Sequence, residues 1–195
     1  MAELRNVSRC SWVSDDPLIL RYHDKEWGTP VNDDRCLFEF IVLEGAQAGL
    51  NWMIILRRRE AYRAAFADFD PARIARFNPR KVESLMRDDS IIRNRRKIEG
   101  AIQNARAYLA LRESGNTLSD FMWKLVGGKP IVNRWRSVSE IPASTPESDA
   151  MSKAMKKVGF TFFGTTICYA HMQAVGMVND HIVTCFRYRE LLRLR

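Results

Sequence analysis

Apolar residues recur at helical spacing along most of this chain. One apolar stripe runs from Leu37 to Ala48, behind Asp33 and Asp34, which can cap a helix. A second lies within residues 95–112, and a helical run starts near Trp52 and continues to residue 66. Further helices are expected at residues 71–77 and 79–87, from Ser119, from Thr145 to Gly159 and from Thr165 or Thr166 to Gly176.

Strand signals are sparse by comparison. The best is residues 129–132, which is too short to define a sheet. The chain has no repeat, no low-complexity tract and no flexible linker. The pattern therefore predicts an all-α protein.

The composition suits one globular domain or two intimate lobes. The chain has 195 residues, of which 46% are hydrophobic. No apolar run approaches the roughly 20 residues that a membrane span needs, and the first ten residues hold no apolar signal core. Four unevenly spaced cysteines fit a reducing cytosol better than a disulfide scaffold.

The net charge of +8 favours an anionic partner. Nucleic acid is the first candidate for this partner, and an acidic membrane surface is the second. The alternative is that the charge serves only solubility. Several separate clusters indicate an extended track more than one pocket. The clusters are Arg57, Arg58 and Arg59; Arg93, Arg95, Arg96 and Lys97; Lys153, Lys156 and Lys157; and Arg187, Arg189, Arg193 and Arg195.

Most of the soft metal ligands fall into two pairs at opposite ends of the chain. Cys10 stands with His23, and His181 with Cys185. Two thiolates and two imidazoles are a favoured tetrahedral zinc set, and one ion bound by all four would join the terminal segments with no ligand position left for chemistry. Because the pairs are so far apart in sequence, a coincidence of scattered residues is the equal alternative.

Residues 85–106 read as a short helix, a turn and a long basic helix. Backbone amides at the turn, near Ser90, and the start of the second helix can bind a DNA phosphate. Arg93 and Arg95 add charge at the same place. The alternative is an ordinary helix pair with a solvated basic face.

Large aromatic residues and one carboxylate gather towards the N-terminal end. Trp12, Tyr22, Trp27 and Trp52 flank glycines, prolines and charged residues, where pockets form, although aromatics at such spacing are often only core. Glu44 follows an apolar helix and is expected to be partly buried, and so hydrogen-bonded or functional. The alternative is a surface glutamate one step off the stripe.

A set of ordered motifs resembles a known family over about residues 9 to 186. They are RCSWVSDDPL, RYHDKEWGTP, LFEFIVLEGAQAGLNW, IIRNRRKIEGAIQNARAYL and SEIPASTPESDAMSKAMKKVGFTFFGTTICYAHMQAVGMVNDH, followed by Cys185. They look like bacterial 3-methyladenine DNA glycosylase I. The family's members are helix-hairpin-helix DNA glycosylases that flip a damaged base out of the duplex and hydrolyse its glycosidic bond.

The resemblance implies an architecture. Residues 1–195 form a single compact catalytic unit, with a helix-hairpin-helix lobe at about 34–130 and a second lobe made of 1–33 and 131–195. A structural zinc ion held by Cys10, His23, His181 and Cys185 staples that second lobe. The resemblance also makes residues 85–106 the DNA-anchoring hairpin.

The resemblance also assigns roles in the base pocket. Glu44 matches the carboxylate that reads the methylated base and serves catalysis, Tyr22 and Trp52 match aromatics packed against the base, and Trp12 and Trp27 lie near the pocket. The chain departs from the family's pattern at Ile19, Ala46 and Asn51, so the resemblance does not determine the fine substrate preference.

Contacts to the DNA follow in the same way. Leu50 falls where a wedge would enter the base stack, and Ser90, Arg93, Arg95 and Lys97 fall in the anchoring hairpin. Some related enzymes use a lysine near the position of Lys97 as a nucleophile and then cut the backbone. The match here is to a monofunctional family, so Lys97 is expected to contact a phosphate.

The expected substrate is 3-methyladenine in double-stranded alkylated DNA. The expected setting is the bacterial cytoplasm at the nucleoid, as a monomer, with no membrane and no obligate protein partner. Two rival functions remain: a non-catalytic helix-hairpin-helix DNA-binding module, and a zinc-stapled interaction protein that does not bind DNA. The first needs no pocket of Tyr22, Glu44 and Trp52, and the second leaves the basic clusters unexplained.

Overall fold

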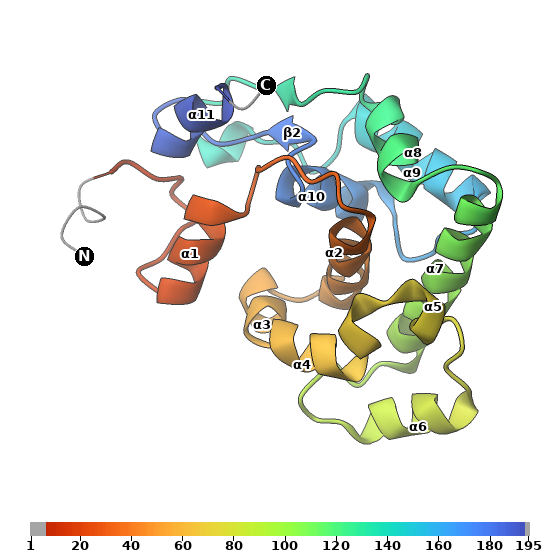
Figure 1. The fold of residues 1–195 in the computed structure, drawn as a ribbon. Coiled ribbons are helices and arrows are strands. Elements are labelled where there is room, and N and C mark those ends of the chain that lie inside the picture. Colours follow the sequence, from red (N-terminus) through yellow and green to blue (C-terminus); the bar gives the residue numbers. More distant parts are fainter. Residues whose placement is uncertain (1–6, 194–195) are drawn as a thin grey trace.

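Helices make up nearly all the regular structure in residues 7–193, the part of the chain that the computed structural model describes (Figure 1). The two strands, β1 (Ile131–Val132) and β2 (Val178–Asn179), form one short parallel pair. The prediction of a helical fold is confirmed. The helices are α1 (Pro17–Lys25), α2 (Asp34–Gln47), α3 (Trp52–Arg57), α4 (Arg59–Ala65), α5 (Pro71–Ile74), α6 (Pro79–Arg87), α7 (Arg95–Glu113), α8 (Leu118–Leu125), α9 (Pro146–Lys157), α10 (Thr165–Ala174) and α11 (Phe186–Leu191), with 3-10 turns η2 (Ala67–Phe69) and η3 (Val138–Glu140).

Side-chain caps begin the helices where the sequence predicts them. The Asp33 carboxylate accepts from the Cys36 amide at 2.8 Å and starts α2. Asp70 starts α5, Asn78 starts α6, and Thr145 forms a capping box at α9. Each such cap contributes about 1 kcal/mol because it satisfies amides that have no partner inside the helix.

Three boundaries differ from the prediction. The run from Trp52 to residue 66 is broken at Arg58, whose ψ of 2° ends α3 and starts α4. Helix α5 ends at Ile74. Helix α8 begins after Thr117 rather than Ser119, because the Thr117 hydroxyl accepts from the Asp120 amide at 2.8 Å.

The terminal helices α1 and α11 were missed. Asp16 and Pro17 carry the same start signal as Asp70 and Pro71, and the Asp16 carboxylate accepts from the Leu18 amide at 2.9 Å. Helix α11 orders much of the basic tail, and Arg187 in it is buried and paired with Glu190. The end of that tail, including Arg195, lies outside the described residues.

Helix α2 is the centre of the fold. Every residue from Leu37 to Ala46 is buried, so this helix is covered on all sides. It packs against α10, α7, α8 and α3. Glu44 is thereby placed inside the molecule, in the last turns of a helix with no solvent face.

The N-terminal and C-terminal segments of the described chain are joined by backbone hydrogen bonds. The Phe186 amide donates to the Ser8 carbonyl at 2.9 Å, and the Gly28 amide donates to the Gln173 carbonyl at 3.0 Å. Gly176, with φ of +71°, lies against this crossing, and a Cβ there would meet the Thr29 carbonyl carbon at 2.4 Å. The division into lobes at 34 and 130 stays a prediction. No described helix has both the length and the apolar character that crossing a membrane requires.

Candidate functional site

A cavity of about 400 Å³ opens between α1, α2, α3 and α10. Its walls are largely aromatic or apolar, and Glu44 supplies the only carboxyl group among the described residues that line it. Such a cavity suits a flat, mostly apolar ligand held by a few polar groups. The lining residues are Trp12, Tyr22, Trp27, Glu44, Gln47, Trp52, Val138, Ile141, Pro142, Ala143, Thr166, Tyr169, Ala170 and Gln173.

Glu44 is buried without a partner. The side chain is 3% exposed, and its carboxyl group makes no hydrogen bond or ion pair with the described part of the chain. Burial raises the pKa of Glu44 to about 8, since no nearby cation or donor favours the charged form. The expected burial is confirmed. An unpaired carboxylate of this kind is costly to the fold and marks a binding or catalytic group.

The predicted aromatics surround this carboxyl group. Tyr22 and Trp52 pack with ring centroids 5.4 Å apart, and Trp12 meets Trp27 edge-on at 5.0 Å. Burial and the nearby Glu44 raise the pKa of Tyr22 well above its usual value. The indole Nε1 of Trp52 is buried and has no hydrogen-bond partner within the described chain. All five predicted pocket residues therefore come together.

The opposite wall was missed by the sequence reasoning. Thr166, Tyr169, Ala170 and Gln173 follow the helical spacing i, i+3, i+4 and i+7, so one face of α10 lines the cavity. Residues 138–143 complete this wall. The periodic face could have been found, but nothing in the sequence indicates that it faces α1 and α2.

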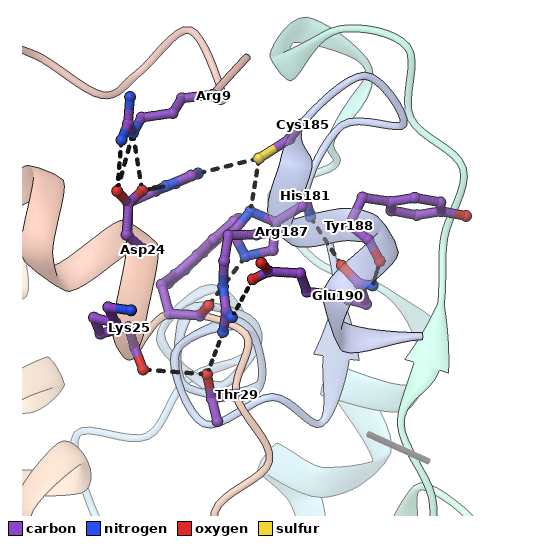
Figure 2. A network of polar contacts seen from close by, with 12 residues as sticks. Arg9, Asp24, Lys25, Thr29, His181, Cys185, Arg187, Tyr188 and Glu190 are labelled. Carbon is purple, nitrogen blue, oxygen red and sulfur yellow. Dashed lines mark hydrogen bonds and ion pairs between the residues drawn. The ribbon is translucent and has the colours of Figure 1, made fainter. Parts of the chain in front are cut away.

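Cys10, His23, His181 and Cys185 form a second buried cluster. One ligand atom from each lies within 4.8 Å of the others. The Sγ atom of Cys185 lies 3.5 Å from His23 Nε2 and 3.5 Å from His181 Nδ1, and Cys10 Sγ lies 3.6 Å from His181 Nδ1. Figure 2 shows Cys185 against His181 at the junction of the terminal segments.

These spacings fit a zinc ion. With zinc–sulfur bonds of about 2.3 Å and zinc–nitrogen bonds of about 2.0–2.1 Å, a tetrahedron places sulfur and nitrogen about 3.5 Å apart. In each histidine, the ring nitrogen that does not face the cluster also has a hydrogen-bond partner, as in most metal-binding histidines. His23 Nδ1 pairs with Asp24 at 2.7 Å, and His181 Nε2 pairs with the Trp27 carbonyl at 3.0 Å.

Asp24 is itself fixed by a charged neighbour. The Arg9 guanidinium pairs with its carboxylate at 2.7 Å (Figure 2). Hydrogen bonds from Arg9 and His23 lower the pKa of Asp24 against the opposing effect of burial, which is the largest single influence. The residues present could therefore hold one metal ion with two thiolates, two imidazoles and an ordered surrounding shell.

Helices α6 and α7 are the short helix and the long basic helix that the sequence predicts, and their role as a DNA-anchoring hairpin stays a prediction. The side chains of Arg93 and Arg95 are exposed, and Arg95 pairs with Glu83 at 2.6 Å. The Ser90 amide and hydroxyl both donate to Asp88, which fixes the turn. The amides of Arg93, Arg95 and Arg96 have no hydrogen-bond partner within residues 7–193, so they are available to an anion at the start of α7.

Lys97 is engaged elsewhere. Its Nζ donates to the carbonyls of Ala46 at 2.8 Å and Ala48 at 2.7 Å, and burial lowers the pKa of Lys97. The ammonium group thus closes the C-terminal end of α2 in the structure, and the predicted phosphate contact by Lys97 stays untested.

Leu50 lies on the turn that Lys97 holds. Gly49 has φ of +79°, and the side chain of Leu50 that follows is exposed, as a wedge requires. Leu50 and Glu44 together line a smaller cavity of about 150 Å³.

The departures from the family pattern lie outside the main cavity. Ile19 is buried in the core, Asn51 caps α3 through the Met53 amide, and Ala46 supplies a carbonyl to Lys97. None of the three is among the residues that line the cavity, within the part of the chain described. His171 is fully buried, and burial lowers its pKa to about 3.

An aromatic cavity with one buried carboxyl group is typical of a protein that binds a flat, mostly apolar ligand through a few polar contacts. The chain belongs to the methyladenine glycosylase family, whose model matches residues 12–188. It is 53% identical to DNA-3-methyladenine glycosylase 1 of Escherichia coli K12 over 182 residues, which cover 93% of this chain and 97% of that protein.

Solved structures agree with this family. A crystal structure of 3-methyladenine DNA glycosylase I is 55% identical, with a TM-score of 0.90, and the match covers 92% of this chain and 98% of that one. The Staphylococcus aureus glycosylase I, solved to explain its recognition of 3-methyladenine, is 32% identical with a TM-score of 0.88 and coverage of 91% and 95%. The resemblance inferred from the motifs is confirmed.

Proposed function

We propose that this protein excises 3-methyladenine from double-stranded alkylated DNA by hydrolysis, without a lyase step. The observation that carries the proposal is Glu44, a buried and unpartnered carboxyl group in an aromatic cavity. Relatives that span nearly the whole chain are named for this activity. A non-catalytic DNA-binding module would not explain why the fold keeps a buried carboxyl group that destabilises it.

The base is recognised by charge as well as shape. 3-Methyladenine in DNA is cationic, and the faces of Tyr22 and Trp52 attract a cation through their ring quadrupoles. The cation also favours the ionised form of Glu44, which is otherwise protonated at neutral pH because its pKa is raised to about 8. The carboxylate then accepts a hydrogen bond from the exocyclic amine of adenine.

Bond cleavage needs little help from an acid. The glycosidic bonding electrons leave with the base, which becomes neutral, so no proton has to be supplied to the leaving group. Water adds its oxygen to the sugar carbon and releases a proton to solvent. The pocket contributes by holding the flipped nucleotide in a water-poor site, oriented for this displacement.

Engagement of DNA is assigned to two neighbouring features. Leu50 enters the base stack from its turn, and the α6–α7 segment acts as a helix-hairpin-helix anchor through Arg93, Arg95 and the free amides at the start of α7. The link from Lys97 to Ala46 and Ala48 joins this anchor to the helix that carries Glu44.

The same link supports the monofunctional assignment. A lysine nucleophile must be unprotonated and free to reach the sugar. The Lys97 ammonium instead donates to two carbonyls at the end of α2. Borohydride reduction during turnover should leave no covalent protein–DNA adduct, and such an adduct would refute the assignment.

We also propose a structural zinc ion at Cys10, His23, His181 and Cys185. The zinc-like spacings and the ordered outer nitrogens support it. These four side chains would hold the ion, which would stabilise the junction of the terminal segments. His23 follows Tyr22 in α1, so the junction also holds one wall of the pocket.

The decisive test is release of free base. Methylated duplex DNA is incubated with the protein, and the supernatant is analysed chromatographically for 3-methyladenine. Release of the base with an intact abasic strand is expected. Salt-sensitive DNA binding without release would instead favour the non-catalytic module. Sedimentation of the same sample tests the expected monomer.

A further inference from the structure

Asp180 is a buried carboxylate behind the pocket wall that was missed. It is 1% exposed and directly follows β2. Its Oδ1 accepts from Asn133 Nδ2 at 2.6 Å and Trp135 Nε1 at 2.8 Å, and its Oδ2 accepts from the Tyr169 hydroxyl at 2.6 Å and Gln173 Nε2 at 2.8 Å. Each carboxylate oxygen of Asp180 therefore accepts two hydrogen bonds.

The four donors belong to two separate elements of that wall. Tyr169 and Gln173 lie on α10 and line the cavity themselves. Asn133 and Trp135 lie just before residues 138–143, which line the cavity next to α10. One side chain thus ties together the two parts of the wall, which are about thirty residues apart in sequence.

The buried charge of Asp180 is not compensated by an ion pair with a described residue. The buried Asp24 pairs with Arg9, and the buried Glu39 pairs with Arg59 and Arg63. Asp180 contacts no lysine or arginine in the described part of the chain, and neutral donors alone compensate its burial. Such a fully satisfied network fixes the positions of its members, because breaking any bond leaves a buried group unpaired.

We propose that Asp180 is a positioning residue for base binding. It holds the α10 face and residues 138–143 at a fixed separation opposite Tyr22, Glu44 and Trp52, so that the cavity matches one base. Because a misplacement of about 1 Å can cost about a hundredfold in rate, the network controls excision without touching the base. This inference rests on the proposed function of the same cavity.

The test separates geometry from fold stability. Asp180→Ala removes all four bonds, whereas Asp180→Asn keeps the shape and lets the amide groups of Asn133 and Gln173 rotate to new partners. Tyr169→Phe and Asn133→Ala each remove one donor and leave Asp180 and the neighbouring His181 unchanged, so they decide the matter if Asp180→Ala does not fold. Tyr108→Phe is the matched control, because Tyr108 donates to Asp34 at 3.1 Å at the opposite end of α2 from Glu44.

The readouts are the affinity for free 3-methyladenine, followed by tryptophan fluorescence, and the single-turnover excision rate. Metal content and Tm are measured for every variant. Tyr169→Phe and Asn133→Ala should each weaken base binding about threefold to tenfold, the equivalent of one hydrogen bond. Asp180→Ala should lose at least about tenfold in rate, and Asp180→Asn should recover most of it. Tyr108→Phe should lower Tm alone.

Two results would overturn the proposal. One is base affinity and rate at the wild-type level in Tyr169→Phe, Asn133→Ala and Asp180→Ala, with only Tm reduced. The other is an Asp180→Asn variant as poor as Asp180→Ala, since retained shape would then not be enough. If the wild-type protein itself releases no base, the proposed function fails instead, and the two failures are thus distinguished.

Discussion

Glu44 should destabilise the fold in a way that depends on pH. The folded protein holds the proton of this carboxyl group more tightly than the unfolded chain does, since burial raises the pKa from 4.5 to about 8. Protonation of Glu44 therefore contributes to the free energy of unfolding. This contribution is fully present below the pKa of the unfolded chain and is lost as the pH rises towards the pKa of the folded protein. Glu44→Gln has the shape of the protonated form and no charge, so it should escape this loss.

The size of the effect follows from linkage. A difference of one pKa unit between folded and unfolded protein corresponds to about 1.4 kcal/mol. With values of 4.5 and about 8 for Glu44, the wild-type protein should lose about 2–3 kcal/mol between about pH 5 and about pH 7 through this group. For a chain of this size that is about 5–10 °C in Tm.

The assay is thermal or urea unfolding of wild type and Glu44→Gln across this pH range. The difference between the two removes titrations that they share, including those of the histidines. Glu99→Gln on the exposed face of α7 is the matched control and should follow wild type at every pH. The reasoning is refuted if the Glu44→Gln and wild-type stabilities run parallel from about pH 5 to about pH 8.

Four further predictions concern the Cys/His cluster, Lys97, Arg93 and the pH dependence of excision. Cys10→Ser should lose bound zinc and have a lower Tm, and its activity should fall only as a consequence. A variant that loses activity while its zinc content and Tm stay at the wild-type level would contradict this order. Lys97→Met should lower stability by about 1–3 kcal/mol, because two carbonyls lose a charged donor, and calorimetry measures this; unchanged stability would contradict the role assigned to the link. Arg93→Ala should reduce the salt dependence of DNA binding by about one charge, measured by titration at several salt concentrations, and an unchanged slope would remove Arg93 from the interface. The second-order rate constant kcat/KM of wild-type excision, which reports the free enzyme, should rise with pH towards about 8 as Glu44 ionises. A kcat/KM that falls over that range would contradict the role of the carboxylate as acceptor.

The Cys/His cluster and the pocket are linked, because residues of the cluster are sequence neighbours of residues on two walls of the pocket. His23 follows Tyr22 on α1, and His181 follows Asp180 after β2. The Trp27 carbonyl pairs with His181 Nε2, while the Trp27 ring lines the cavity. Metal binding and pocket shape should therefore respond together when the terminal junction is disturbed.

Local signals predicted much of the fold. Asp33, Asp70, Asn78 and Thr145 cap helices as their residue types require, because capping depends on atoms only two or three residues away. The break at Arg58 could not be predicted in this way, since the stretch on either side is helix-forming and the packing of α3 and α4 decides the kink.

The candidate site was predictable in part for a similar reason. Glu44 and its aromatics were found because a carboxylate at the end of an apolar helix is chemically conspicuous. Tyr169 and Gln173 were not, because their relevance depends on how α10 faces α2, which is a tertiary relation. Lys97 was expected at a phosphate, yet in the structure its ammonium group lies on the carbonyls of Ala46 and Ala48, a contact that no local pattern indicates.

The central claim is that a buried carboxyl group in an aromatic cavity selects and releases the methylated base. The most direct test is the single-turnover release of 3-methyladenine from methylated duplex DNA by wild type and Glu44→Gln, with both proteins shown to be folded and to bind the DNA. The account predicts release by wild type and a rate at least about tenfold lower for Glu44→Gln, because one charge-assisted contact to the base is lost. Equal rates of release by the two proteins would contradict it.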